Sequence, residues 1–155
     1  MLIFIFQQAV GLITVYEHIT HSQNENKVDE MIIDQQITGG FQGGREHIVV
    51  DGSERIINHQ IFGDIKERAV WSDLSEVDDD WLKEGWSNSP TTTSDSSRMP
   101  HLKVSVTNET LGWVLVVVWG FIIAGGQRHH CRRLVCRKGD EVEKVRSVYG
   151  WVDSL

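Results

Sequence analysis

The stretch Leu111–Gly126, LGWVLVVVWGFIIAGG, decides between two folds for this chain, because its sixteen residues carry no charge. A membrane-spanning helix needs about 20 apolar residues, so the stretch is slightly short, although the basic residues that follow it would suit a membrane flank. Valine and aromatic residues favour a β-strand instead, and the pair Gly125-Gly126 is typical of a hairpin turn. We therefore expect a strand here, with a single membrane span over residues 111–126 as the alternative.

Composition indicates one ordinary globular domain. The chain has 155 residues, of which 40% are hydrophobic and 24% are charged, with a formal net charge of −7. That charge disfavours a nucleic-acid binder, which needs a broad basic face to neutralise phosphates. Two cysteines are too few for a disulfide framework and predict free thiols in a reducing compartment. No basic residue precedes Lys27, so the apolar run Met1–Phe6 does not resemble a secretory signal, and we expect a cytoplasmic protein.

Short alternating segments bounded by turn residues run through most of the chain. Asp51-Gly52 is the strongest hairpin signal and predicts that Arg45–Val50 pairs with Ser53–Gln60. The expected strands are Gly11–Thr20, Met31–Thr38, Arg45–Val50, Ser53–Gln60, Ile65–Trp71, His101–Thr107, Trp113–Ile123, Arg128–Arg137 and Val142–Trp151. Eight or so antiparallel strands predict an all-β sandwich or barrel, and a closed eight-stranded barrel has room for one small ligand.

One segment departs from the strand period. In Ser75–Gly85, apolar residues fall on one helical face, Ser75 is a candidate N-cap and Gly85 is a suitable stop. Its consecutive carboxylates, 78–80, fit the first turn of this short helix better than a catalytic pair, which needs facing geometry across a cleft. The Ser/Thr-rich stretch 87–100 that follows predicts a flexible surface loop.

Arginines occupy both faces of the expected strand 128–138. Arg132 shares one face with Arg128 and His130, whereas Arg133 lies on the other, so one arginine must point inward. A buried arginine is costly unless it is paired. Either the interior holds an anionic or polar group of a ligand, or a carboxylate such as Glu67, Asp34 or Glu143 pairs with the arginine; the second alternative is the more ordinary one.

Metal and redox chemistry receive little support from the sequence. Cys131 and Cys136 are five residues apart, and this odd spacing sends them to opposite faces of a strand, so we expect no disulfide between them. With His129 and His130 they form no recognised zinc-ligand spacing, and we expect no metal and no cofactor. The weak candidates for catalysis are Arg68 and Arg132 as oxyanion-type donors, with His59 or Tyr149 for proton transfer.

Scattered motifs along the chain resemble, in order, a group of small and mostly uncharacterised fungal proteins that is similar to lipocalins and other calycins. The motifs are Ile33–Gly40, His59–Gly63, Arg68–Trp71, Leu74–Trp86, Gly112-Trp113, Trp119–Phe121, Arg132-Arg133 and Val145–Tyr149. The resemblance implies a lipocalin-like antiparallel barrel over residues 1–155 with one short helix. The group has a Gly-x-Trp motif in its first strand, which is absent here, so that strand is either missing or replaced by Met1–Phe6.

The resemblance implies binding of a hydrophobic small molecule, such as a fungal secondary metabolite, inside the barrel. By analogy with barrel proteins of fungal metabolite pathways, the alternative is a cofactor-free cyclase or isomerase. The residues that we expect to face the ligand are Gln35, Arg68, Trp71, Trp119 and Arg132. The identity of the ligand and the oligomeric state stay open.

Overall fold

The computed structural model describes residues 15–38, 41–87 and 101–151 of the chain. Nine antiparallel strands in two sheets account for most of this part, which confirms the all-β class. No ladder joins the two sheets within the described residues, so a closed lipocalin-like barrel stays a prediction. The chain splits into two compact units, Met1–Asp51 and Gly52–Leu155, and each is described by itself. The expected loop 88–100 and the start Met1–Phe6 lie outside the described residues.

The first sheet is a three-stranded meander. It contains β1 (Val15–Gln23), β2 (Asp29–Ile37) and β3 (Phe41–Val50), in the order β1-β2-β3. The side chain of Ile33, in the central strand, is completely buried, as expected for a β-branched residue in the middle of a sheet. The register between β2 and β3 shifts between Asp34 and Gln36, which is a local irregularity of the bulge type.

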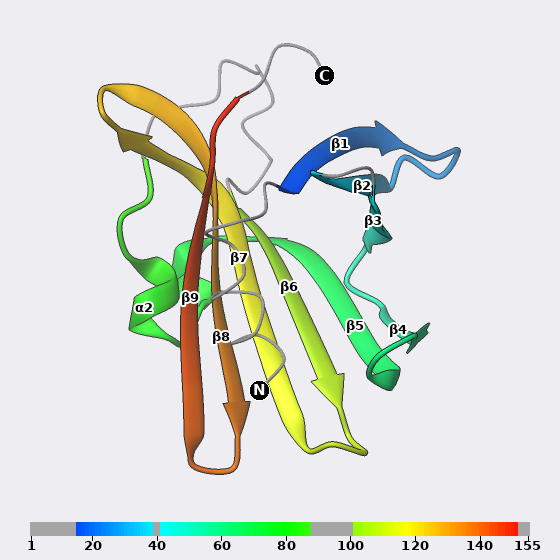
Figure 1. Cartoon of the computed structure of the whole chain (residues 1–155). Coiled ribbons are helices and arrows are strands. Elements are labelled where there is room, and N and C mark those ends of the chain that lie inside the picture. Colours follow the sequence, from blue (N-terminus) through cyan, green and yellow to red (C-terminus); the bar gives the residue numbers. More distant parts are fainter. Residues whose placement is uncertain (1–14, 39–40, 88–100, 152–155) are drawn as a thin grey trace. The chain divides into compact units, whose positions relative to one another are not determined.

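The second sheet has six strands in sequence order (Figure 1). Their bounds are β4 (Glu54–His59), β5 (Gly63–Ser72), β6 (His101–Asn108), β7 (Trp113–Ala124), β8 (Gln127–Lys138) and β9 (Glu141–Tyr149). Glycines with positive φ, Gly125, Gly126 and Gly139, form the two turns that flank β8. Tight turns between consecutive strands are what the sequence predicts for this half of the chain.

The uncharged stretch Leu111–Gly126 contains a strand, β7. β7 pairs with β6 on one side and with β8 over Val114–Ala124 on the other. Its valines and aromatic residues suit a pleated strand, and its centre is buried on both faces by Val118 and Trp119. A single membrane helix over residues 111–126 is therefore wrong, and none of the helices in the described ranges is long and apolar enough to cross a membrane.

The predicted hairpin at Asp51-Gly52 is wrong. β3 pairs with β2, and β4 pairs with β5, so the chain leaves the first sheet and enters the second at this dipeptide. Gly52 has a φ of 76° and donates its backbone N–H to the carbonyl of Ala69, at 2.9 Å. The dipeptide forms a bend, and β3 and β4 each pair with their other neighbour in the chain, β2 and β5.

The helix expected over Ser75–Gly85 is two separate turns. A 3₁₀ turn, η1 (Leu74–Glu76), follows Asp73, and a single α-helical turn, α2 (Asp80–Lys83), follows Asp79. The carboxylates of Asp73 and Asp79 cap these turns, accepting backbone N–H groups at 2.8 and 2.9 Å, so Ser75 is not the N-cap. Val77 between them is extended, with φ −101° and ψ 123°, because aspartates compete for caps and a buried valine favours extended backbone.

We call residues 73–87 the strap, because this segment packs across one face of the second sheet. Val77, Leu82 and Trp86 of the strap form a buried core with residues of β7 and β8. The sheet residues of that core are Val118, Ile122, Cys131 and Val135. We call this side of the second sheet the strap face, and the opposite side the cluster face.

Candidate functional site

A row of side chains crosses the cluster face from β5 to β9. The strand registers place Trp71 opposite Leu102, Leu102 opposite Trp119, Trp119 opposite Arg132, and Arg132 opposite Ser147. Directly paired residues in an antiparallel sheet project to the same side. Three of the residues expected to contact a ligand, Trp71, Trp119 and Arg132, therefore share one face.

Arg132 is held between two aromatic rings. Its guanidinium carbon lies 3.7 Å from the ring centroid of Trp119 and 5.0 Å from that of Tyr149. Trp119 is 6% exposed, and stacking on so buried a ring fixes the guanidinium plane. Arg128 stacks in the same way on Phe121, at 3.7 Å, further along the same face.

His130 occupies the centre of this group. Its ring makes edge contacts with Trp119, Phe121 and Tyr149, with centroid separations of 5.6, 5.8 and 5.1 Å. Burial, and then the positive charge of Arg132, lowers the pKa of His130 from 6.5 to about 4. The imidazole is therefore neutral at neutral pH, as expected for a desolvated histidine beside a cation.

Among the described residues, two rings next to Arg132 each bury a polar atom that has no hydrogen-bond partner. These atoms are Nε1 of Trp119 and Nε2 of His130. A buried polar atom that makes no hydrogen bond carries a desolvation cost, which a ligand with complementary groups would relieve. We call these residues the cation–aromatic cluster: Trp119, Phe121, Arg128, His130, Arg132 and Tyr149.

The other residues expected at the site lie elsewhere. Arg68 is exposed and pairs in register with Ser105, so it projects to the strap face, away from Arg132. Nδ1 of His59 accepts the backbone N–H groups of Ile61 and Phe62 at 3.2 and 3.3 Å, which is a local structural role at the end of β4. The structure therefore brings Arg132 and Tyr149 together, and brings neither Arg68 nor His59 to them.

Gln35 belongs to the first sheet, at the irregularity in β2. Its side chain donates a hydrogen bond to Glu17 at 3.2 Å. A Cβ at Gly43 would lie 2.6 Å from the Cβ of Gln35, so the bulge depends on glycine at that position. The hydrogen bond to Glu17 and the close packing against Gly43 give Gln35 a structural role in the first sheet.

His130 was not among the residues predicted from the sequence to take part in proton transfer. The signal was present, because strand alternation already placed His130 on the face of Arg128 and Arg132. What the sequence could not supply was the burial that lowers the pKa of His130, since that depends on three rings from β7 and β9.

Arg133 is the arginine that points inward, and its partners differ from the expected ones. It is 5% exposed, and its Nη1 donates to the carbonyl of Trp81 at 2.7 Å and lies 3.9 Å from Glu84. The strap, rather than Glu67, Asp34 or Glu143, supplies both groups. Cys131 and Cys136 project to opposite faces and are free thiols, as expected.

The fold and the cluster define an all-β protein with an ordered cation–aromatic group on one sheet face. In the described ranges, no three or more histidine, cysteine or carboxylate side chains gather as a metal site.

The chain is similar to a protein of Mollisia scopiformis named probable pericyclase scpY, with 28% identity over 115 residues. The match covers 73% of this chain, which spans a little over half, 57%, of that protein. The chain is thus a distant homologue of a fungal pericyclase. No model of a known protein family matches the chain, and no solved structure does.

Proposed function

We propose that this chain is a cofactor-free enzyme of secondary metabolism that cyclises or isomerises a small organic molecule on the cluster face. The observation that carries the proposal is the guanidinium of Arg132, held 3.7 Å from the Trp119 ring beside a neutral His130. The similarity to a protein named probable pericyclase supports the reaction class. A pericyclase catalyses concerted reorganisations that pass through a cyclic transition state.

A concerted cyclisation needs few functional groups from the protein. Holding a flexible substrate in its reactive conformation removes much of the entropic barrier, and flat aromatic side chains such as Trp119 and Tyr149 suit a conjugated substrate. A cationic donor that binds a carbonyl of the substrate draws electron density from the adjoining double bonds. The N–H groups of Arg132 have this role in the proposal, and they are already oriented before the substrate arrives.

Where the reaction includes proton transfer, His130 is the candidate group. With a pKa of about 4 it is a weak base that stays unprotonated at neutral pH. It accepts a proton only in a transition state where negative charge develops nearby, for which Arg132 is positioned. Tyr149, whose ring lies 5.1 Å from that of His130, is the second candidate.

Binding of a hydrophobic small molecule is the first step of this function and is the simpler proposal. Binding and catalysis make different predictions for Arg132. A carrier would lose affinity when the arginine is removed, whereas an enzyme would lose rate, with a smaller change in affinity.

The test uses linear conjugated trienones, each with a diene and an enone in one molecule, which also cyclise slowly without protein. The rate and the stereoisomer ratio of the cyclised product are measured by chiral chromatography and mass spectrometry. We expect the wild-type chain to accelerate at least one trienone or to change its isomer ratio, and Arg132→Ala to return both toward the spontaneous values.

Arg146→Ala is the matched control, because Arg146 is an exposed arginine of the neighbouring strand on the strap face. It should leave the rate unchanged. Rates and isomer ratios equal to those in buffer for every trienone, together with measurable binding, would overturn the enzymatic proposal and support a carrier. Equal losses in the two variants would show that total charge, rather than the cluster, is responsible.

A further inference from the structure

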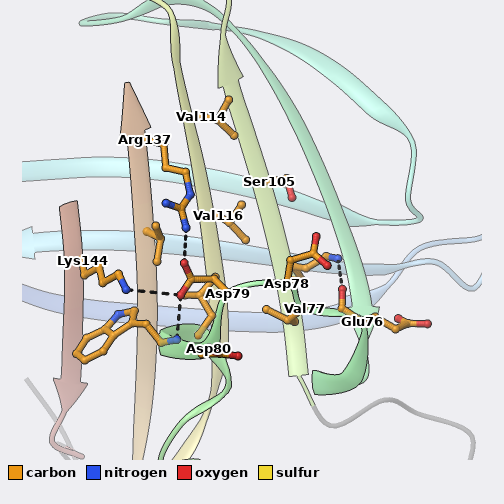
Figure 2. A pocket seen from close by; sticks show the side chains of 14 residues that line it. Glu76, Val77, Asp78, Asp79, Asp80, Ser105, Val114, Val116, Arg137 and Lys144 are labelled. Atoms are coloured by element: carbon orange, nitrogen blue, oxygen red, sulfur yellow. Dashed lines mark hydrogen bonds and ion pairs between the residues drawn. The ribbon is translucent and has the colours of Figure 1, made fainter. Parts of the chain in front are cut away.

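A cavity of about 550 Å³ lies between the strap and strands β6 to β9 (Figure 2). The strand registers place its sheet residues on the strap face, opposite the cation–aromatic cluster. The volume of the cavity is in the range of pockets that hold small ligands. No step of the proposed function uses it. We call it the strap cavity.

Mostly apolar side chains of the sheet line one wall of the strap cavity, and cationic side chains lie at one end of that wall. The registers place Ser105, Val116, Val135 and Lys144 side by side across β6, β7, β8 and β9. In the next row Val114 pairs with Arg137, so the two cations adjoin the same apolar surface. Val77 and Leu82 of the strap supply apolar surface to the other wall.

Arg137 and Lys144 converge on a single carboxylate, that of Asp79 (Figure 2). Arg137 donates to one oxygen of this carboxylate, while the Nζ of Lys144 lies 3.9 Å from the other. That second oxygen also accepts the backbone N–H of Trp81, at 2.9 Å. The two cationic side chains stay 49% and 45% exposed, whereas Asp79 is 15% exposed.

Two positive charges that share one carboxylate leave an excess positive charge at this end of the cavity. Across the cavity, the Nζ of Lys103 donates to a neutral group, the carbonyl of Glu76, at 3.4 Å. The lining also includes the carboxylates of three exposed residues, Glu76, Asp78 and Asp80, and within the described residues none of them pairs with Arg137 or Lys144. Asp80 also pairs with Lys83, at 3.4 Å.

We propose that the strap cavity binds a small amphipathic carboxylate. Its carboxylate is held by Arg137 and Lys144, and its hydrocarbon body lies on Val114, Val116 and Val135. The side chain of Asp79 already occupies the position proposed for the ligand's carboxylate. The ligand therefore either shares Arg137 and Lys144 with Asp79 or displaces Asp79 from them. Charge-assisted contacts of this kind are stronger than neutral ones and select for the anion.

The test compares three probes with the same hydrocarbon chain: decanoate, decan-1-ol and decylamine. Binding is measured by isothermal titration calorimetry at neutral pH, below the concentrations at which the probes form micelles. We expect decanoate to bind about tenfold more tightly than decan-1-ol, the ratio expected of one charge-assisted hydrogen bond. Decylamine should bind most weakly.

Two lysine variants with equal loss of charge locate the site. Lys144→Gln should reduce the affinity for decanoate several-fold and leave that for decan-1-ol unchanged. Lys138→Gln removes the charge of an exposed lysine that the cavity lining does not include, and should change neither affinity. Equal binding of decanoate and decan-1-ol, or equal effects of the two variants, would overturn the proposal.

Asp79→Asn tests the role of the internal carboxylate. Asparagine is an equally good helix cap, so α2 keeps its start while the competing negative charge is removed. We expect decanoate to bind more tightly to this variant than to the wild type, and a decrease would contradict the proposal.

Arg132→Ala should leave decanoate binding unchanged; loss of binding there would place decanoate on the cluster face instead. Thermal unfolding of each variant confirms that the fold is retained.

Discussion

Arg132 and Arg133 are neighbours on β8, and each stacks on a tryptophan, yet the two guanidinium groups have different surroundings. Arg133 lies 4.4 Å from the ring centroid of Trp81 and donates to the carbonyl of the same residue. Arg132 lies 3.7 Å from the ring centroid of Trp119 on the opposite face, within a group of rings that includes His130. Strand alternation therefore gives two identical residues different environments.

The two arginines differ in the partners that the chain supplies to each guanidinium group. Arg133 is buried under the strap, and the hydrogen bond to Trp81 anchors the segment that covers the strap face. Arg132 lies against the rings of Trp119 and Tyr149 on the cluster face, and stacking on these rings orients its guanidinium. We therefore expect loss of Arg133 to affect stability and loss of Arg132 to affect function.

The largest effect should come from Arg132→Ala. If this residue is the cationic donor of the proposed cyclase, its removal should reduce the turnover of an accepted trienone by roughly 100- to 1000-fold. The free energy of unfolding should change by less than about 1 kcal/mol, because the residue is partly exposed. Turnover assays and urea unfolding on the same preparation measure both. An unchanged rate would remove Arg132 from the mechanism.

Arg133→Ala should give the converse result. The substitution removes the hydrogen bond to the Trp81 carbonyl and the ring contact, and leaves a void beneath the strap. We expect a loss of about 2–4 kcal/mol in the free energy of unfolding. Urea unfolding measures this loss, and Arg146→Ala, at the register position opposite Arg133 on β9, is the exposed control. A loss no larger than that of the control would show that the strap does not depend on Arg133.

Much of the second sheet is predictable, because its signals are local. The glycines after β7 and β8 predict the strand bounds to within a few residues, and the alternation within 128–137 places Arg132 and Arg133 on opposite faces without saying which of them is buried. The two errors, at Asp51-Gly52 and at Ser75–Gly85, depend on which strands pair and on what the strap covers. Contacts of the strap with distant residues of β7 and β8 override the local helix signal. At Asp51-Gly52 the bend joins two hairpins, each made of consecutive strands, instead of closing one.

The candidate site is less predictable than the fold. Trp119, Arg132 and Tyr149 could be proposed from residue type, and strand register then places them on one face. Arg68 has the same residue type as Arg132, but its position in β5 directs it to the other face. The importance of His130 depends on its burial, and the strap cavity depends on Asp79 meeting Arg137, which is 58 residues away in the chain.

Gly120 tests how tightly the strap face is packed. A Cβ at this position would lie 2.8 Å from Cδ2 of His101 and 2.9 Å from Cε3 of Trp86. Gly120→Ala must therefore displace one of these buried rings, and overpacking of this kind costs about 1–3 kcal/mol. Thermal or urea unfolding measures the loss. Gly112→Ala is not a suitable control, because its φ of 70° adds backbone strain; Ser147→Ala, on the cluster face, is better. Stability equal to that of the wild type would mean that the strap moves away at little cost.

His130 gives the cluster face a pH dependence of stability. Its folded-state pKa, about 4, is below the value of 6.5 expected in the unfolded chain, mainly because of burial. As the pH falls from 6.5 towards 4, the unfolded chain binds a proton that the folded chain does not, so the free energy of unfolding decreases. The contribution is fully present above pH 6.5 and is lost by about pH 4.

His130→Phe removes this titration while keeping an aromatic ring among Trp119, Phe121 and Tyr149. Since His130 is partly exposed, we expect the wild type to lose about 1–2 kcal/mol more than the variant between pH 7 and about pH 4, less than the full shift implies. Urea unfolding at both pH values measures the difference. The pKa of His101 is also lowered by burial, with Asp73 opposing the shift, so His101 titrates in the same direction in both proteins and cancels. Parallel pH profiles of the two proteins would mean that His130 ionises as freely as in water, which would remove the neutral imidazole from the proposed mechanism.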